Sequence, residues 1–242
     1  MIEIKNLYKK YKEDVLKGID LEFPDNGLFC IVGPSGCGKS TLLNIIYGNI
    51  REFKGQLIIN NKFVKSFNEN ELNNFKLENI GYVHQNFNLI DDLLVEDNIL
   101  LHLETTQNVS NVHKRKLLHK ISKECEIENL LKSKTKDCSG GEKQRIAIAK
   151  AIINSPSIVL ADEPTGNLDE ENSNKIFNLL QNISKNRLVI VVTHDLDLAN
   201  KYSNKIIYLK DGKIIKQTKK KNKTIKEDIW THKKANIKNV FN

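Results

Sequence analysis

Short runs of apolar residues, several of them rich in β-branched side chains, recur in the first and last thirds of the chain. These runs are residues 2–7, 28–32, 57–59, 80–83, 158–161, 188–193 and 206–209. The runs at 158–161 and 188–193 alternate little with polar residues, which is typical of strands buried on both faces of a parallel sheet. The pattern therefore predicts an α/β domain in which helices cover both sides of a mostly parallel sheet.

A different pattern fills the middle of the chain. Between about residues 86 and 154 the strand signal is missing, and residues 96–103, 112–126 and 142–154 have helical periodicity instead. A further helix is expected at residues 39–47. We interpret residues 86–154 as a helical subdomain inserted between strands of the core. Residues 1–216 then form one domain, followed by a tail or linker at 217–242.

The charge is concentrated in that tail. From residue 219 to residue 242 eight lysines stand against Glu227 and Asp228, so this stretch holds +6 of the formal net charge of +8. A lysine-rich tail without glycine is most simply a solvated extension. An anionic membrane surface is the next partner considered. Nucleic acid is not expected, because the tail has few aromatic residues and no arrangement typical of a reading helix.

Composition excludes two classes of protein. The mean hydropathy is −0.43 and no apolar run approaches the ~18 residues of a membrane helix. The N-terminus lacks the basic and then apolar layout of a secretory signal. Four cysteines, Cys30, Cys37, Cys125 and Cys138, have no metal-ligand spacing, which favours reduced thiols in a cytosolic protein.

The most specific motif follows the apolar run at residues 28–32. The chain there fits the pattern G-x-x-x-x-G-K-[ST] at every fixed position. Glycines let successive backbone N–H groups converge on phosphate oxygens, Lys39 brings a cation to the outer phosphates, and the Ser40 hydroxyl is a magnesium ligand. The residues assigned to the nucleotide are Gly33, Pro34, Ser35, Gly36, Cys37, Gly38, Lys39, Ser40 and Thr41. Strand, loop and helix follow in the order that aims a helix N-terminus at an anion.

Two carboxylates end the apolar run at residues 158–161. Asp162 is positioned to hold magnesium through water and Ser40, and Glu163 to orient or deprotonate a water that attacks the γ-phosphate. The alternative for a single acid in this place is a helix N-cap. The pair in a chain that also has the glycine loop favours the catalytic interpretation.

A second candidate phosphate site starts the helix at 142–154. Ser139, Gly140, Gly141 and Glu142 read locally as a serine N-cap with glycines, and also as an anion-binding helix N-terminus. One nucleotide needs only one such loop. The second loop therefore serves another phosphate group, or the same phosphates from another molecule.

Together these motifs resemble the ATP-binding cassette (ABC) ATPases, over about residues 1–216. The segment from Cys138 to Glu142 takes the place of the family signature Leu-Ser-Gly-Gly-Gln/Glu, and residues 161–169 join the magnesium Asp, the catalytic Glu and the D-loop. Together with residues 81–89, the sequence of this segment resembles one branch of the family in particular. That branch contains macrolide exporters, lipoprotein-release ATPases, antimicrobial-peptide resistance transporters and the cell-division ATPase FtsE.

The resemblance implies roles for four more residues. Gln85 matches the Q-loop, which senses magnesium and couples to the membrane domain, and His194 matches the switch histidine at the γ-phosphate. Tyr11 stands where the family stacks an aromatic ring on adenine, and Asp169 belongs to the dimer interface. The resemblance also implies ATP and Mg²⁺ as cofactors and an antiparallel β subdomain beside the P-loop core.

Each of these four residues has an ordinary alternative. Gln85 reads equally as a solvated surface residue, and His194 as a satisfied loop histidine. Tyr11 competes with Tyr8 as the stacking ring, or packs in the core. Asp169 reads as the cap of a helix that starts near residue 170.

The resemblance further implies an ATP-dependent homodimer, in which ATP on one glycine loop is closed by Ser139–Gly141 of a second copy. The expected function is an ATP-hydrolysing subunit or domain that powers export, lipoprotein release or mechanotransmission. Its partner would be a separate or fused transmembrane permease, with an FtsX-like fold as one candidate form, at the cytoplasmic face of the cell membrane. The alternative is an FtsE-like ATPase that controls a wall hydrolase through a membrane partner.

Three positions depart from the family pattern. Cys138 replaces leucine, Lys143 replaces a common glutamine, and His84 stands where the branch has phenylalanine. None of the three removes a phosphate ligand, so activity is expected. We also expect Cys37 and Cys138 of opposing copies to come close enough in the closed dimer for oxidative crosslinking.

Overall fold

The computed structural model describes residues 1–104 and 110–219. The strands within these residues are β1 (Ile2–Lys10), β2 (Asp14–Phe23), β3 (Gly27–Val32), β4 (Lys54–Ile59), β5 (Lys62–Phe63), β6 (Ile80–Val83), β7 (Ile158–Asp162), β8 (Leu188–Thr193), β9 (Lys205–Lys210) and β10 (Lys213–Lys219). The α-helices are α1 (Lys39–Tyr47), α2 (Glu69–Asn79), α3 (Val95–Glu104), α4 (Asn111–Glu124), α5 (Gly140–Ile152), α6 (Glu170–Ile183) and α7 (Leu196–Tyr202).

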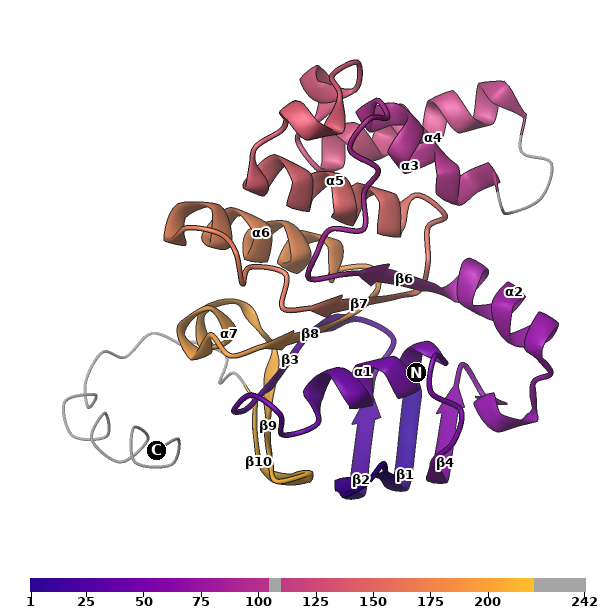
Figure 1. Ribbon diagram of the computed structural model, residues 1–242, viewed down its shortest axis with the longest axis vertical. Coiled ribbons are helices and arrows are strands. Elements are labelled where there is room, and N and C mark those ends of the chain that lie inside the picture. The colour runs from indigo at the N-terminus through magenta and orange to yellow at the C-terminus, as the bar shows by residue number, and fades with distance from the viewer. Residues whose placement is uncertain (105–109, 220–242) are drawn as a thin grey trace.

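A six-stranded sheet in the order β10-β9-β3-β8-β7-β6 forms the centre of the molecule. All of its neighbours pair in parallel except β10 with β9. Alternate residues of β3 enter different cores: Leu28, Cys30 and Val32 pack with the helical side, whereas Phe29 and Ile31 pack with α1 and the second sheet. The predicted α/β fold with a mostly parallel sheet, covered on both faces, is confirmed (Figure 1).

The second sheet is antiparallel, with strand order β2-β1-β4-β5. It lies across α1 from the central sheet (Figure 1), and the backbone N–H of Lys17 in β2 donates to the carbonyl of Gly212, 2.8 Å away, beside β10. The implied antiparallel β subdomain is therefore present, but β2 was not among the predicted strands. A bulge explains the omission, because Asn6 and Gly18 both have positive φ and the β1–β2 register shifts beside Asn6.

Helices α3, α4 and α5 form a layer beyond the central sheet (Figure 1). They correspond to the three helices predicted between residues 86 and 154. Helix α2 was not predicted, because only Leu72 and Phe75 along its length are buried. Its start is nevertheless marked by a capping box between Asn68 and Glu71.

The C-terminal strand β10 runs to Lys219, so residues 217–219 of the predicted tail are part of a strand. The remainder of that tail, residues 220–242, lies outside the described residues. Among the helices of the described residues, none is both long and apolar enough to cross a membrane.

Candidate functional site

The glycine loop at residues 33–40 connects the central strand β3 to α1. Gly36 and Gly38 have φ values of 78° and 106°, a region that favours glycine. At Gly33 the restriction is space, because a Cβ atom there would lie 2.0 Å from the carbonyl oxygen of Leu209. The strand neighbours of β3 therefore hold the loop in a shape that the predicted glycines alone accommodate.

The backbone N–H groups in the first turn of α1 have no capping side chain. Its N-cap residue is Gly38, which makes no side-chain cap hydrogen bond, and the first turn has no acidic residue. The N–H groups of this turn are thus available to an anion, which the helix dipole also favours. Thr41 lies in the same turn, and Pro34 and Ser35 form the outer part of the loop.

Lys39 is buried, and its ammonium group points back over the loop. Its Nζ atom donates to the carbonyls of Gly33, at 2.9 Å, and Pro34, at 3.1 Å, and lies 4.0 Å from Oε1 of Glu163. A cation at this point faces the loop and the Glu163 carboxylate at once. Lys39 therefore lies beside the residue that follows β7.

Ser40 and Asp162 meet although 122 residues separate them in sequence. The Ser40 hydroxyl donates to Oδ1 of Asp162 at 3.0 Å. Pairing of β7 with β8, and of β8 with β3, brings the ends of the two strands to the same edge of the sheet. The two oxygen ligands expected for magnesium are thus adjacent.

Tyr82 is a member of this cluster that sequence reasoning missed. Burial, the charge of Asp162 and a hydrogen bond with that carboxylate raise the pKa of the Tyr82 hydroxyl. Its ring lies 4.7 Å from that of Tyr47 and 4.5 Å from that of His84, centroid to centroid. Burial lowers the pKa of His84. The available signal was the place of Tyr82 on β6, the strand that pairs with β7.

Glu163 and His194 form a second pair at the same edge. His194 Nδ1 lies 2.8 Å from Oε2 of Glu163, whose side chain is 15% exposed. Glu163 has a φ of 47°, which is strained for a residue with a side chain, and its N–H donates to the carbonyl of Val192. The Glu163 carboxylate contacts His194 through one oxygen and lies 4.0 Å from the Lys39 ammonium group through the other.

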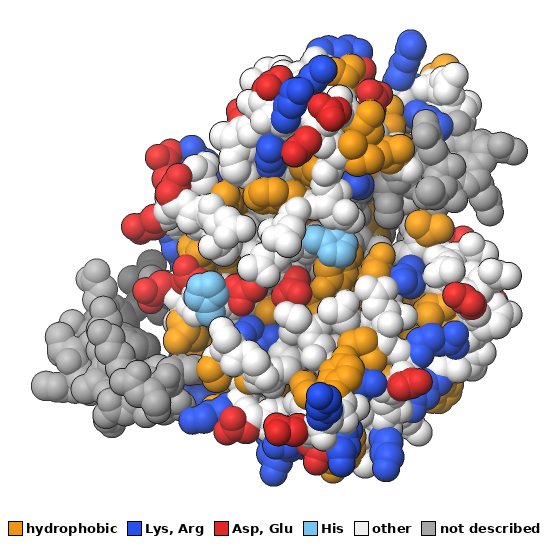
Figure 2. Space-filling view, in the orientation of Figure 1, with side chains coloured by type: hydrophobic (Ala, Val, Ile, Leu, Met, Phe, Trp, Pro, Cys, Tyr) orange, Lys and Arg blue, Asp and Glu red, His pale blue; other side chains and the backbone are white. Residues whose placement is uncertain are grey.

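Gln85 lies on the exposed segment after β6. A Cβ atom on Gly166, in the turn that follows Glu163, would be 3.7 Å from Nε2 of Gln85. The amide of Gln85 therefore lies beside the turn that follows Glu163. In Figure 2 acidic and histidine side chains lie close together in the middle of this face, between the helical layer and the antiparallel sheet.

The candidate adenine platform is at the end of β1. Tyr11 is 55% exposed, and the ammonium group of Lys9 lies 4.7 Å from the centre of its ring. Tyr8 is 43% exposed, but its hydroxyl lies over Gly18 within the antiparallel sheet. Tyr11 is therefore not a core residue, and its ring is the more open of the two.

At the N-terminus of α5, Ser139 and Glu142 bond to each other in a capping box. The N–H and hydroxyl of Ser139 both donate to Oε2 of Glu142 at 2.8 Å, and these bonds lower the pKa of the Glu142 carboxyl. Gly140 and Gly141 follow directly. This N-terminus lies in the helical layer, well apart from the glycine loop of the same chain (Figure 1).

Asp169 performs the capping role that was its alternative. It is the N-cap of α6 and accepts bonds of 2.8 Å from the backbone N–H and the side-chain amide of Asn172. These bonds lower the pKa of its carboxyl. Asn172 in turn lies against Gly141, because a Cβ atom there would be 2.7 Å from the Asn172 amide oxygen.

Neither Cys37 nor Cys138 offers its thiol at the surface of the protomer. Cys37 is 6% exposed with its sulfur turned toward Gly33, and Cys138 is 9% exposed with its thiol near the Lys134 carbonyl. Burial raises the pKa of both thiols. Because the thiolate is the reactive form, this geometry argues against the expected crosslink.

The residues at the sheet edge fit a magnesium–nucleotide complex better than a metal alone. In the described part of the chain no three His, Cys, Asp or Glu side chains gather as a metal cluster. Ser40 and Asp162 supply two oxygens, and the open α1 N-terminus is suited to the phosphates that complete a magnesium shell.

Comparisons with known proteins agree with this geometry. A family model described as ABC transporter matches residues 16–166. Two curated relatives are the cell division ATP-binding protein FtsE of Bacillus subtilis (strain 168), 36% identical over 89% of this chain and 95% of the relative, and the lipoprotein-releasing system ATP-binding protein LolD of Pseudoalteromonas translucida (strain TAC 125), 37% identical over 88% and 94%.

Among solved structures, the dimeric post-hydrolysis state of the ATP-binding cassette MJ0796, of Methanocaldococcus jannaschii, bound to ADP and Pi, matches with a TM-score of 0.82. It is 36% identical, and the match covers 91% of this chain and 99% of that one. This chain and the MJ0796 cassette share one fold, and that fold carries the glycine loop, the Ser40–Asp162 contact and the Glu163–His194 pair described above. The chain therefore belongs to the family of ABC transporter ATP-binding proteins.

Proposed function

We propose that this chain hydrolyses ATP as a homodimer and uses the cycle of closing and opening to drive a membrane protein. The observation that carries the proposal is the pair of helix N-termini. One, at α1, stands beside a lysine, a serine–aspartate pair and a glutamate–histidine pair. The other, at α5, lies apart from it in the same chain, so a second copy is needed to bring both to one nucleotide.

The residues at the sheet edge have separable tasks in this scheme. Lys39 and the backbone of residues 33–40 bind the phosphates, and Ser40 with Asp162 holds Mg²⁺, which neutralises charge on the phosphate oxygens when bound. Glu163 orients the attacking water and takes up its proton, while His194 holds the Glu163 carboxylate and contacts the γ-phosphate. Gln85 reports the state of the site to the segment that follows it.

The dimer gives Ser139, Gly140, Gly141, Glu142 and Asp169 a task that one protomer does not. Ser139, Gly140 and Asp169 are exposed in the protomer, and in the proposed dimer these helix N-termini close the nucleotide of the other copy. Support comes from the related cassette MJ0796, whose solved structure with ADP and Pi is dimeric. Tyr11 completes the site as the ring under the adenine.

We assign the membrane partner to the permease class, at the cytoplasmic face of the membrane, from the relatives. One is named for lipoprotein release and another for cell division. The lysine-rich residues 220–242 would add attraction to anionic lipids. An FtsX-like permease, separate or fused, is the form of partner that we propose.

The direct test of the ATPase is Glu163→Gln, which keeps the size of the side chain and removes the base. We expect ATP binding to persist, turnover to fall by about 10²–10⁴-fold, and the protein to accumulate as a dimer with ATP and Mg²⁺. Glu171→Gln is the matched control, since Glu171 is an exposed residue of α6 that pairs with Lys175. Turnover at the parental rate in Glu163→Gln would remove the role given to Glu163.

A regulatory ATPase of cell division is the second candidate, favoured by the relative FtsE. Affinity purification of the full chain from detergent-extracted membranes separates the possibilities. A permease with a substrate pathway supports transport, whereas a partner bound to a wall hydrolase supports regulation. Purification without any membrane protein would contradict both.

A further inference from the structure

Two segments of the helical layer that are distant in sequence lie side by side as a short antiparallel ribbon. The N–H groups of Thr135 and Lys136 each donate at 3.0 Å, to the carbonyls of Leu93 and Asp91 respectively. Leu94 and Lys134 form the bridge between them. We call residues 90–96 and 131–136 together the clasp.

One buried side chain fastens the clasp from within. Asn98, on α3, has 0% exposure, and its amide accepts from the N–H of Ile90 at 2.8 Å. It donates to the carbonyl of Ile90 at 2.8 Å and to the hydroxyl of Thr135 at 2.9 Å. The Thr135 hydroxyl, also fully buried, donates onward to Leu93 at 3.2 Å. The amide therefore joins both halves of the clasp, and its bond with the Thr135 hydroxyl is buried.

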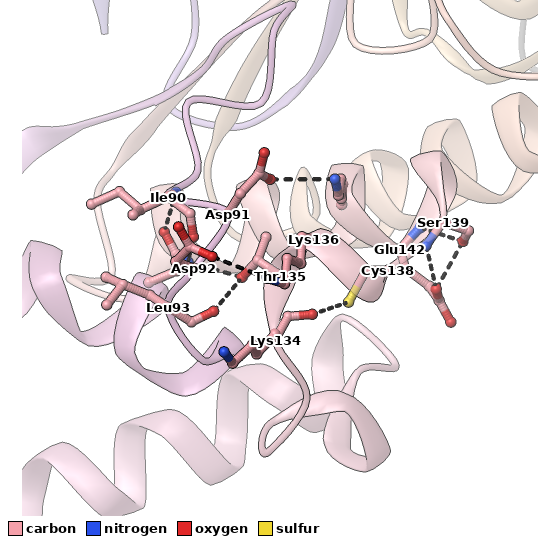
Figure 3. A network of polar contacts seen from close by, with 12 residues as sticks. Ile90, Asp91, Asp92, Leu93, Lys134, Thr135, Lys136, Cys138, Ser139 and Glu142 are labelled. Carbon is pink, nitrogen blue, oxygen red and sulfur yellow. Dashed lines mark hydrogen bonds and ion pairs between the residues drawn. The ribbon is translucent and has the colours of Figure 1, made fainter.

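Three ion pairs fasten it from outside. Lys132 lies 2.6 Å from Glu96, and the other two pairs are drawn in Figure 3. Lys136 lies 3.2 Å from Asp92, and Lys143 lies 3.3 Å from Asp91. Lys143 belongs to the first turns of α5, the helix that Ser139 caps. The clasp thus contacts the signature helix directly as well as through the chain.

The position of the clasp links two places that the function uses. Ile90 is five residues after Gln85, and Thr135 is four residues before Ser139. A displacement of the segment after Gln85 therefore reaches Ser139 through fixed hydrogen bonds, and a loose clasp would leave the α5 N-terminus without a defined position. Fully satisfied buried polar networks make a structure rigid, so we expect the two segments to move together.

We infer that Asn98 is a positioning residue for the second phosphate site: through Thr135 it holds Ser139–Gly141 where the nucleotide of the other copy meets it. The inference rests on the proposed dimer. The inference predicts that dimer closure and ATP binding by the protomer can be changed separately, because the glycine loop lies outside the clasp. Loss of the Asn98 amide should weaken the closing of the dimer while the protomer still binds ATP.

The experiment uses the full chain with Glu163→Gln as parent, so that the ATP-bound dimer persists. Asn98→Ala and Thr135→Val are added separately, with Thr135→Ser as the variant that keeps the hydroxyl. Ser122→Ala is the matched control, since Ser122 is a fully buried polar residue of α4 that bonds only locally, to His119. A fluorescent ATP analogue measures protomer affinity, and sedimentation measures the dimer dissociation constant.

We expect Asn98→Ala and Thr135→Val to raise the dimer dissociation constant at least tenfold, with ATP affinity of the protomer changed less than twofold. Thr135→Ser and Ser122→Ala should match the parent. Unchanged dimerisation in both clasp variants, or an equal loss of ATP affinity, would overturn the inference. If Asn98→Ala does not fold, Thr135→Val against Thr135→Ser decides. A parent that stays monomeric with ATP overturns the proposed dimer, and this inference with it.

Discussion

The helices α1 and α5 both begin at a glycine-containing segment proposed to meet phosphate, yet the chain builds the two N-termini differently. At α1 the cap is Gly38 in a left-handed conformation, without a side-chain bond, and the earlier Gly33 is confined by the carbonyl of Leu209 in β9, whereas Gly36 has open space. At α5 the cap is Ser139, bonded to the chain's own carboxylate at Glu142. The first is shaped by backbone and core packing, and the second by side chains at the surface.

This difference has a functional meaning. The N–H groups of α1 have no competing carboxylate, so that site is ready for phosphate in the protomer. At α5 the Ser139 hydroxyl donates to Glu142, and a phosphate from another molecule must compete for it. The polar groups of the site that the proposed dimer would close are thereby satisfied while the protomers are apart.

The two regions should differ most in how much a glycine-to-alanine substitution lowers the free energy of unfolding. Gly33→Ala places a Cβ atom 2.0 Å from the Leu209 carbonyl oxygen, whereas Gly140→Ala meets only the side chain of Leu168, at 3.4 Å. We expect Gly33→Ala to lower the free energy of unfolding by about 3 kcal/mol and Gly140→Ala to change it by less than about 0.5 kcal/mol. Urea denaturation followed by circular dichroism measures both; equal effects would contradict the contrast.

A smaller effect isolates the charge at the α5 N-terminus. Glu142→Gln keeps the capping geometry but removes the carboxylate, whose pKa is lowered from its ordinary value of 4.5 by the bonds from Ser139. A lowered pKa stabilises the fold above pH 4.5, and that contribution is lost as the pH falls through the folded-state value.

At neutral pH we therefore expect the original chain to be about 0.5 kcal/mol more stable than Glu142→Gln. The advantage should vanish in more acidic buffer, below the lowered pKa. Thermal unfolding across pH 3 to 7, roughly the range in which carboxylates titrate, gives the curve. A difference that stays constant with pH would show that the carboxylate charge has no part in it.

The smallest effect concerns the exposed link from the clasp to α5. Lys143→Met removes the pair with Asp91, and exposed pairs contribute about 0.2–1 kcal/mol. We expect a loss near the lower end in low salt and none in 1 M salt, roughly the strength at which surface charges are screened. Exchange of the two residues, Asp91→Lys with Lys143→Asp, should restore the stability measured by chemical denaturation. If it does not, the stability lost in Lys143→Met comes from packing rather than from the ion pair.

Local patterns carried much of the fold. The bounds 39–47 for α1, 80–83 for β6 and 188–193 for β8 agree with the structure, because apolar periodicity and glycine placement are properties of neighbouring residues. The pattern failed at β2, where a bulge changes the phase of alternation, and at α2, where only two positions are buried. Both failures come from tertiary contacts that the sequence does not display.

The sequence alone determined which chemical groups the site contains: a glycine loop with Lys39 and Ser40, two carboxylates after a strand, and a second glycine pair after a serine. Only the tertiary structure decided that Ser40 meets Asp162, that His194 meets Glu163 and that Asn98 holds Thr135. These contacts join residues from 31 to 122 positions apart. Such pairs depend on strand order and helix packing, which arise from burial of the whole chain rather than from any local run of residues.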